Sequence, residues 1–252
     1  MKAAIITVAG ISSRFNAGVP TPQKELKAIY TEKGAEDTLL YHLLVKCAFA
    51  DVIVIVGGYK YEDLERYCAA LAPALRDRIA LVRNDHYEDL ASGYSLYLGL
   101  REAFGRGADE ILFVEGDLDV DDASFRRVVD AENSVLTYTY EPIYANKAVV
   151  LYRDAEGRYK YAFNSSHGLL KIEDAFSCVL NSGQVWKFTR ADLLRQANDR
   201  FYAETRDGTN LRIIQNYLEA GAEAELVPLV RWTNCNTKED FRKIMTYWEA
   251  EE

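Results

Sequence analysis

Short apolar runs alternate with amphipathic segments through the first half of the chain. Four runs have the length and the β-branched content of buried strands, and they span residues 3–8, 51–56, 79–82 and 110–114. Between them, apolar residues recur at helical spacing, as at Leu40, Leu43, Leu44 and Cys47, and again at Leu96, Leu100 and Phe104. This order of strand and helix predicts a parallel sheet that is covered by helices on both faces.

The second half of the chain has a different pattern of residues. Tyr- and Val-rich strands are predicted at 134–140, 148–153 and 159–163, with a hairpin loop at 154–157 and shorter strands at 178–180 and 184–188. Helices are predicted at 191–204, 211–220 and 238–249, and the last begins with a capping box from Thr237 to Asp240. We therefore predict one mixed α/β domain over residues 1–252, in which the parallel sheet gains an antiparallel edge.

The composition of the chain argues against some classes of binding partner. The formal net charge of −9 argues against a nucleic-acid or membrane-surface binder, because the overall electrostatic field has the wrong sign. No apolar stretch approaches the roughly 18 residues of a membrane span, and Met1-Lys2 leads directly into a predicted strand rather than a signal peptide. We expect a cytoplasmic protein in which an anionic ligand needs a local cationic pocket or a bridging metal ion.

The turn after the first strand is a candidate phosphate site. In α/β sheets, ligands gather at the carboxyl ends of the strands. The turn Ala9-Gly10-Ile11-Ser12-Ser13-Arg14 follows such an end and leaves backbone N–H groups that suit phosphate oxygens. Arg14, and Lys24 of Pro22-Gln23-Lys24, would add the fixed positive charge that a triphosphate requires. An ordinary tight turn with two solvated cations explains this segment equally well.

Asp117 follows another predicted strand end and is a candidate metal ligand. Alternation along an extended tip would point Asp117 and Asp119 to the same side. Mg²⁺ binds phosphates with the help of one or two carboxylates and several waters, so Asp117 suits this ion. Asp121 and Asp122 lie next to a predicted helix, and we interpret them as helix-capping residues rather than metal ligands.

Together these segments resemble the nucleotidyltransferase superfamily. Its members have a glycosyltransferase-A-like, Rossmann-like fold, and they condense a nucleoside triphosphate with a phosphorylated acceptor. The usual motif of that family is G-x-G-x-R followed by P-K. Here Gly10 and Arg14 are present, Ser12 replaces the second glycine, and Pro22-Gln23-Lys24 has one additional residue. The resemblance implies catalytic roles for Arg14 at the β- and γ-phosphates and for Lys24 at the α-phosphate. It also implies a nucleotide-binding half at 1–120 and an acceptor-binding half at 121–252.

The resemblance extends over nearly the whole chain and implies the identity of the nucleotide base. Residues 84–87 and 91–96 resemble the base-recognition segment of cytidylyltransferase-like members, especially the bacterial phosphocholine cytidylyltransferases. This implies CTP as the nucleotide. The implied nucleotide-binding residues are Ala9, Gly10, Ser12, Ser13, Gly57, Asn84, Ser92, Gly93 and Ser95.

The later motifs imply a metal site and an acceptor site. Residues 234–237 resemble the last motif of the family, where many members carry an aspartate as second metal ligand, and molybdenum-cofactor members carry an asparagine. The implied cofactor is Mg²⁺, held by Asp117 and Asn236. Residues 181–183 resemble the segment that closes on the acceptor. The implied acceptor is phosphocholine, a phosphonate or a sugar phosphate. The predicted acceptor contacts are Tyr138, Lys147, Gly183 and Trp186.

Several alternatives stay open at this point. The aromatic residues of the acceptor region suit an amine head group, but packing at a sheet edge or in a homodimer explains each ring as well. Asp117-Leu118-Asp119 is a literal D-x-D, the motif with which glycosyltransferases hold a nucleotide-sugar through a metal. A regulatory module that binds a nucleotide with weakened catalysis is a third possibility, motivated by Ser12 and Asn236. The expected partners are an NTP and a phosphorylated small molecule.

Overall fold

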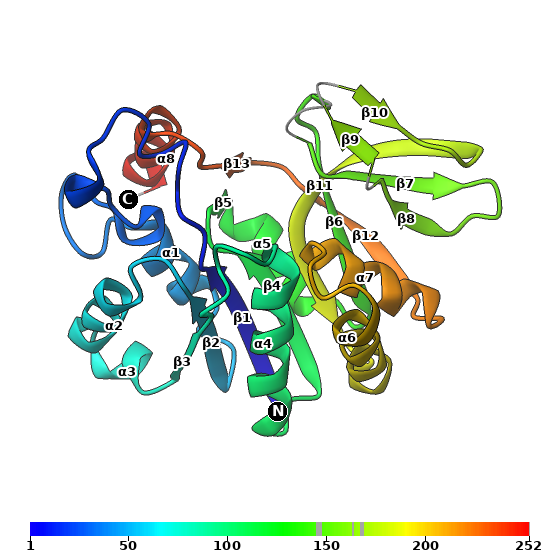
Figure 1. The fold of residues 1–252 in the computed structure, drawn as a ribbon, viewed down its shortest axis with the longest axis horizontal. Helices are drawn as coiled ribbons and strands as arrows, with labels where there is room; N and C mark the ends of the chain where they lie inside the picture. The colour runs from blue at the N-terminus through cyan, green and yellow to red at the C-terminus, as the bar shows by residue number, and fades with distance from the viewer. Residues whose placement is uncertain (145–147, 163, 167–168, 252) are drawn as a thin grey trace.

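A mixed β-sheet forms the centre of the molecule (Figure 1). The computed structural model describes residues 1–144, 148–162, 164–166 and 169–251, and within them the sheet has nine strands. Its parallel part has the order β4-β1-β2-β3, formed by β1 (Lys2–Val8), β2 (Val52–Gly57), β3 (Ile79–Arg83) and β4 (Glu110–Glu115). Figure 1 shows the carboxyl ends of these strands directed toward the end of the molecule where the C-terminal helix lies.

One long strand, β11 (Phe176–Phe188), connects the parallel strands to the remainder of the sheet. It runs antiparallel to β4, β6 and β7, and β6 in turn pairs in parallel with β12. The other strands of this part are β6 (Ser134–Thr139), β7 (Val150–Asp154), β8 (Tyr159–Tyr161) and β12 (Ala224–Leu229). Two small sheets lie apart, formed by β5 (Leu118–Val120) with β13 (Trp232–Asn234) and by β9 (Asn164–Ser166) with β10 (Leu169–Lys171).

Helices cover both faces of the sheet, as the alternation of side chains along its strands requires. Ala4 and Ile6 of β1 point into one core and Ala3 and Ile5 into the other. The first core is closed by α1 (Leu39–Lys46), α2 (Tyr61–Ala70) and α5 (Asp122–Asp130). The second is closed by α4 (Ser92–Gly105), α6 (Ala191–Glu204) and α7 (Asn210–Glu219). The predicted α/β fold class is thereby confirmed.

Shorter elements and the C-terminal helix complete the fold. They are η1 (Thr21–Gln23), η2 (Lys27–Ile29), α3 (Pro73–Arg76) and α8 (Lys238–Glu251). The predicted capping box is confirmed, because the Thr237 hydroxyl accepts from the Asp240 N–H at 3.1 Å and the Asp240 carboxylate accepts from the Thr237 N–H at 2.8 Å. Asp121 caps α5 as predicted, accepting from the Ser124 N–H. No helix within the described residues is long and apolar enough to span a bilayer.

Two predictions for the second half differ from the structure. The segments expected as separate strands at 178–180 and 184–188 are parts of the continuous β11. The turn-like Asn181-Ser182-Gly183 between them produces only an irregularity, in which the pairing register with β6 shifts and Gln184 has φ = 57°. The unpredicted strand β12 contains Pro228, and it tolerates proline because it lies at the edge of the sheet.

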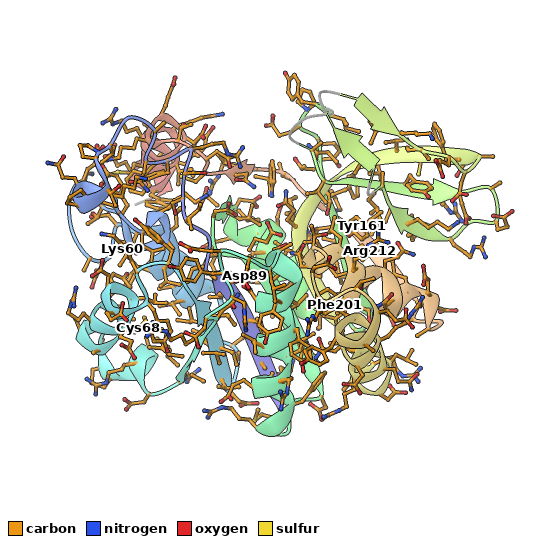
Figure 2. All side chains as sticks on the ribbon, in the orientation of Figure 1. Lys60, Cys68, Asp89, Tyr161, Phe201 and Arg212 are labelled. Carbon is orange, nitrogen blue, oxygen red and sulfur yellow. The ribbon has the colours of Figure 1, made fainter. Side chains whose placement is uncertain are left out.

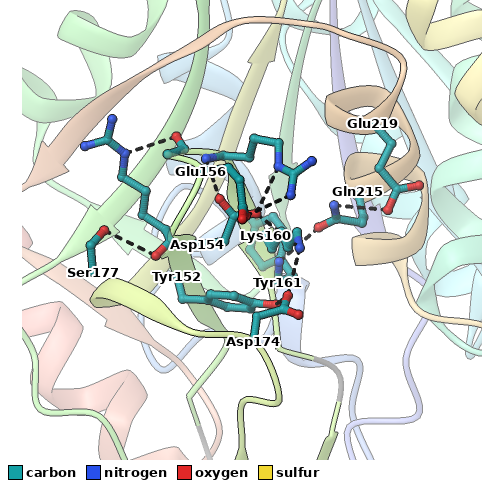
Figure 3. Close-up of polar contacts among 12 residues, drawn as sticks. Tyr152, Asp154, Glu156, Lys160, Tyr161, Asp174, Ser177, Gln215 and Glu219 are labelled. Carbon is teal, nitrogen blue, oxygen red and sulfur yellow. Dashed lines mark hydrogen bonds and ion pairs between the residues drawn. The ribbon is translucent and has the colours of Figure 1, made fainter.

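A polar network fixes the hairpin of β7 and β8 (Figure 3). The Asp154 side chain is 1% exposed and accepts from the Arg158 backbone N–H at 2.8 Å and from its guanidinium at 2.9 Å. Lys160 lies 3.1 Å from Asp154 and 2.7 Å from Asp174, which also accepts from the Tyr152 hydroxyl. The charges of this network neutralise one another, so we interpret it as structural.

Candidate active site

A cleft of about 290 Å³ opens at the carboxyl ends of β1 and β4. The chain runs from β1 outward to β3 and then crosses back through α4 to β4, so this is the point where the strand order reverses. Ligands of doubly wound sheets bind at such a point. Seven predicted site residues line the cleft, namely Ala9, Gly10, Ser12, Asn84, Ser92, Ser95 and Asp117. The structure therefore brings together the turn after β1, the start of α4 and the end of β4.

The turn after β1 contains a residue, Ser12, in a backbone conformation that glycine usually adopts. Ser12 has φ = 52°, in the left-handed region that favours glycine, and it occupies the position of the second glycine in the G-x-G-x-R motif. Asn16, which is 2% exposed, donates its side-chain amide to the Ser12 carbonyl at 3.0 Å. The same side chain exchanges two hydrogen bonds of 2.9 Å with the Glu25 backbone. Asn16 thus joins the turn to the segment that leads into η2.

Lys27 extends from η2 into the cleft and was not predicted from the sequence. Its neighbours Leu26 and Ala28 are each 3% exposed and anchor this segment in the core. The Lys27 ammonium lies 2.9 Å from Asp117 Oδ2, and its side chain is 15% exposed. Lys27 is the one lysine or arginine among the described residues that line the cleft. The sequence signal for it is weak, because Lys24 matches the family spacing better.

Two carboxylates meet at the end of β4. Glu115 accepts a hydrogen bond of 2.6 Å from the Asn210 amide, and the Asn210 backbone N–H donates to Ser92 at 3.2 Å. Burial, and then repulsion from Asp117, raise the pKa of Glu115 to about 7. Asp117 Oδ1 is buried and has no hydrogen-bond partner among the described residues, which makes it a candidate ligand atom.

Gly116 allows these carboxylates to lie beside β1. A Cβ at this position would come within 2.3 Å of the Val8 side chain and 2.8 Å of the Thr7 carbonyl. The Gly116 N–H donates to that same carbonyl at 3.0 Å. The end of β4 therefore approaches the backbone of β1 more closely than a residue with a side chain would permit.

Asp119 has a different environment from Asp117. Asp117 lies in a turn before β5, so the side-chain alternation expected of an extended strand does not include it. The Asp119 side chain is 1% exposed, forms an ion pair with Arg231, and accepts from Trp248 Nε1 at 2.9 Å. The two carboxylates therefore have different partners, and Asp119 is not among the residues that line the cleft, so the expectation that both face one side is not supported.

The predicted catalytic cations lie outside the lining of the cleft. Ser13 and Arg14 are exposed on the turn after β1, and Lys24 is partly exposed just after η1. Within the described part of the chain, the Arg14 and Lys24 side chains form no hydrogen bond or ion pair. Both roles remain predictions.

Two other predicted site residues also lie outside the cleft lining. The Asn236 backbone N–H donates to Asp240 at 2.9 Å, within the cap of α8, and its amide lies 3.4 Å from the Asn234 carbonyl. At Gly57, a Cβ would come within 2.5 Å of Leu64 and 3.0 Å of Tyr61, so this glycine accommodates the packing of α2. Neither residue belongs to the surface that surrounds Asp117 in the cleft.

Gly93 is a close-packing position between α4, α6 and the loop before α7. A Cβ there would lie 2.5 Å from the Gly208 carbonyl and 2.5 Å from the Phe201 ring, which Figure 2 shows between α4 and α6. We expect Gly93→Val to lower the free energy of unfolding by about 1–3 kcal/mol, because a backbone carbonyl cannot move aside easily. Urea unfolding of this variant measures the effect.

The matched control for this substitution is Gly105→Val at the exposed end of the same helix, where a Cβ meets no described atom within 4 Å. The control should change the free energy of unfolding by less than about 1 kcal/mol. If Gly93→Val proved as stable as wild type and instead weakened CTP binding, the sequence-based role of Gly93 at the base would be supported.

The predicted acceptor residues do not form one surface. Trp186 is fully buried, stacks on Phe113 with ring centroids 5.0 Å apart, and donates Nε1–H to the Tyr161 hydroxyl at 2.6 Å. At Gly183, a Cβ would come within 2.5 Å of a core leucine side chain, so this glycine accommodates packing inside the sheet. Tyr138 is half-buried and packs edge-on against the exposed Tyr140. Lys147 lies outside the described residues.

A metal ion at this cleft needs oxygen atoms from water or a substrate in addition to those of the protein. The described residues include no group of three or more His, Cys, Asp or Glu side chains arranged to hold a metal ion. Mg²⁺ needs only one or two carboxylates when phosphate oxygens and waters complete its shell. The buried, unpartnered Asp117 Oδ1 and the adjacent Glu115 fit that limited requirement.

Comparison with protein families identifies one match. The family described as "Domain of unknown function (DUF6564)" matches residues 23–248, which is most of the chain. Comparison with curated proteins finds no match. The family description itself states no activity.

Solved structures with the same fold include three nucleotidyl-transferring proteins. The inositol-1-phosphate CTP transferase from T. maritima has 17% identity and a TM-score of 0.67, with 97% of this chain and 95% of that chain covered. The CTP:phosphocholine cytidylyltransferase from Streptococcus pneumoniae has 18% identity and a TM-score of 0.69, with 98% and 99% covered. The nucleoside-diphosphate-sugar pyrophosphorylase from Vibrio cholerae has 16% identity and a TM-score of 0.65, with 98% and 100% covered. The predicted nucleotidyltransferase fold is confirmed.

Proposed function

We propose that this chain, which belongs to the DUF6564 family, is a nucleotidyltransferase that joins a nucleoside triphosphate to a phosphorylated small molecule. The observation that carries the proposal is the cleft at the reversal of strand order, where the Ser12 turn, Lys27 and Asp117 come together. Proteins of the same fold include an inositol-1-phosphate CTP transferase and a CTP:phosphocholine cytidylyltransferase, which supports this class of reaction.

The charges of the cleft support a requirement for a divalent cation. Asp117 offsets the charge of Lys27, and Glu115 adds negative charge whenever it is ionised, so the cleft lining has no surplus of positive charge for a triphosphate that enters alone. We propose that Asp117 holds Mg²⁺, which neutralises phosphate charge when it is bound. Glu115 is the other carboxylate among the described residues that line the cleft, whereas the predicted second ligand, Asn236, lies outside that lining.

The proposed reaction places little covalent chemistry on the protein. An oxygen of the acceptor phosphate attacks the α-phosphorus, the bond from that phosphorus to the bridging oxygen breaks, and pyrophosphate leaves with both electrons of the bond. Backbone N–H groups of the turn after β1 bind phosphate oxygens, and Arg14 and Lys24 on its flanks add positive charge. The acceleration comes from positioning and charge stabilisation.

We further propose that the base is cytosine. Asn84 and Ser95 line the cleft, and the Asn84 amide donates to Ser95 at 2.9 Å while its oxygen accepts from the His86 N–H at 2.8 Å. These bonds hold the wall of the cleft rigid. A site whose polar groups are held in fixed positions discriminates against a mismatched base, because that base leaves buried polar groups unpaired. The two CTP-dependent proteins of this fold support the same choice.

The experiment that tests this function is a pyrophosphate-release assay with each of the four NTPs, Mg²⁺ and a set of acceptors. The acceptors are phosphocholine, a phosphonate, inositol-1-phosphate and glucose-1-phosphate. We expect release that depends on an acceptor, with CTP at least about tenfold better than ATP or GTP. A preference for GTP would contradict the choice of cytosine, and no release with any pair would contradict nucleotidyl transfer.

A further inference from the structure

We propose that Lys27 and a divalent cation compete for Asp117, and that the Lys27 ammonium, once it is released, binds the nucleotide phosphate next to the metal. This inference rests on the proposed function for the identity of the ligand. The charge that couples metal binding to nucleotide binding is then that of Lys27 and not that of Lys24 in the family motif.

The position of Lys27 is fixed from two sides. Its backbone N–H lies 3.4 Å from the Ser12 hydroxyl, so its backbone is in contact with the turn expected to bind phosphate. Its ammonium lies 2.9 Å from Asp117 Oδ2, with the two side chains 15% and 26% exposed. Lys27 therefore spans the distance between the phosphate-binding turn and the carboxylate, whereas Lys24 is outside the cleft lining.

The environment of Asp117 favours an exchange of cations. Glu115 and Asp117 repel each other, and the Lys27 ammonium offsets part of that repulsion. A divalent cation at the unpartnered Oδ1 would carry twice the charge of Lys27 and would weaken the attraction between Lys27 and Asp117. The nearest new anion for the ammonium is then a phosphate oxygen of the incoming nucleotide. Lys27 would touch the substrate and is in that sense a catalytic residue.

This exchange predicts that Lys27→Ala changes two affinities in opposite directions. Without nucleotide, the variant should bind Mn²⁺ roughly tenfold more tightly than wild type, because a competing positive charge has been removed. With Mn²⁺ present, its affinity for a non-hydrolysable CTP analogue should fall roughly tenfold or more, because a charge-assisted phosphate contact is lost. Electron paramagnetic resonance of free Mn²⁺ measures the first affinity, and calorimetric titration of the analogue measures the second.

Three further variants of the full-length chain complete the experiment. Lys27→Gln removes the charge but retains most of the length of the side chain, and it should behave as Lys27→Ala does, which guards against a misfolded alanine variant. Lys27→Arg preserves the charge and should bind Mn²⁺ as wild type does. Lys24→Ala is the matched control and should leave Mn²⁺ affinity unchanged, whatever its effect on turnover.

The outcomes separate this inference from the proposed function. Unchanged or weaker Mn²⁺ binding by both Lys27→Ala and Lys27→Gln would overturn the inference, even if wild type releases pyrophosphate. Absence of Mn²⁺ binding to every variant and to wild type would overturn it as well. Tighter Mn²⁺ binding and weaker analogue binding would support it. If that result accompanied a wild type without pyrophosphate release, the proposed function alone would be contradicted.

Discussion

Asp117→Asn is expected to reduce pyrophosphate release by roughly 100- to 1000-fold while the protein remains folded. The substitution removes the carboxylate that we propose as the metal ligand and retains its shape. The lost ion pair with Lys27 is partly exposed, and repulsion from Glu115 disappears with it, so the free energy of unfolding should change by less than about 1 kcal/mol. Assays of release and of thermal unfolding without metal measure the two effects.

Asp122→Asn is the matched control for this variant. Asp122 lies five residues later, on the first turn of α5, and its side chain is 70% exposed in an ion pair with Lys46. We expect its activity to equal that of wild type. An Asp117→Asn protein that retained full activity and an unchanged Mg²⁺ requirement would show that the metal is held elsewhere.

Asp119→Ala is expected to lower the free energy of unfolding by about 3 kcal/mol, the lower end of the range for breaking a buried charge pair. Asp119 is 1% exposed and accepts from Trp248 Nε1, so its removal breaks a hydrogen bond between β5 and α8 and the ion pair with Arg231. Arg231 is 20% exposed and reaches solvent in part, which limits the loss. Urea unfolding followed by circular dichroism measures the change.

The same protein tests the D-x-D alternative. Because Asp119 faces α8, the folded fraction of Asp119→Ala should bind Mn²⁺ with wild-type affinity. Lost metal binding together with unchanged stability would instead support a glycosyltransferase-like pair of aspartates. The two aspartates of one tripeptide therefore have different expected effects, one on activity and one on folding.

The fold was largely predictable because buried strands and amphipathic helices have distinct periods. β4 (Glu110–Glu115) and α6 (Ala191–Glu204) were found in the sequence within a residue of their bounds. Rules for α/β sheets then indicated that functional residues gather at the strand ends. That rule correctly predicted that the Ser12 turn and Asp117 would lie together in one cleft.

The positions of several site residues depend on tertiary packing, and the sequence did not predict them. Trp186 resembled an acceptor contact, but the alternation of β11 directs it into the core against Phe113. Gly93 resembled a close approach to a base, yet Phe201, from a helix in the second half of the chain, occupies that space. Lys27 was missed because motif spacing favoured Lys24, and only the fold brings Lys27 to Asp117. These contacts join segments that no local pattern relates.

The most direct test of nucleotidyl transfer is phosphorus-31 nuclear magnetic resonance of wild-type protein with CTP, Mg²⁺ and a phosphorylated acceptor. The proposed reaction predicts free pyrophosphate and, in equal amount, a new diphosphate diester that contains the α-phosphorus of CTP and the acceptor phosphorus. Asp117→Asn should form neither product at a comparable rate. Release of inorganic phosphate or CDP without a diester, or equal diester formation by Asp117→Asn, would contradict nucleotidyl transfer at this cleft.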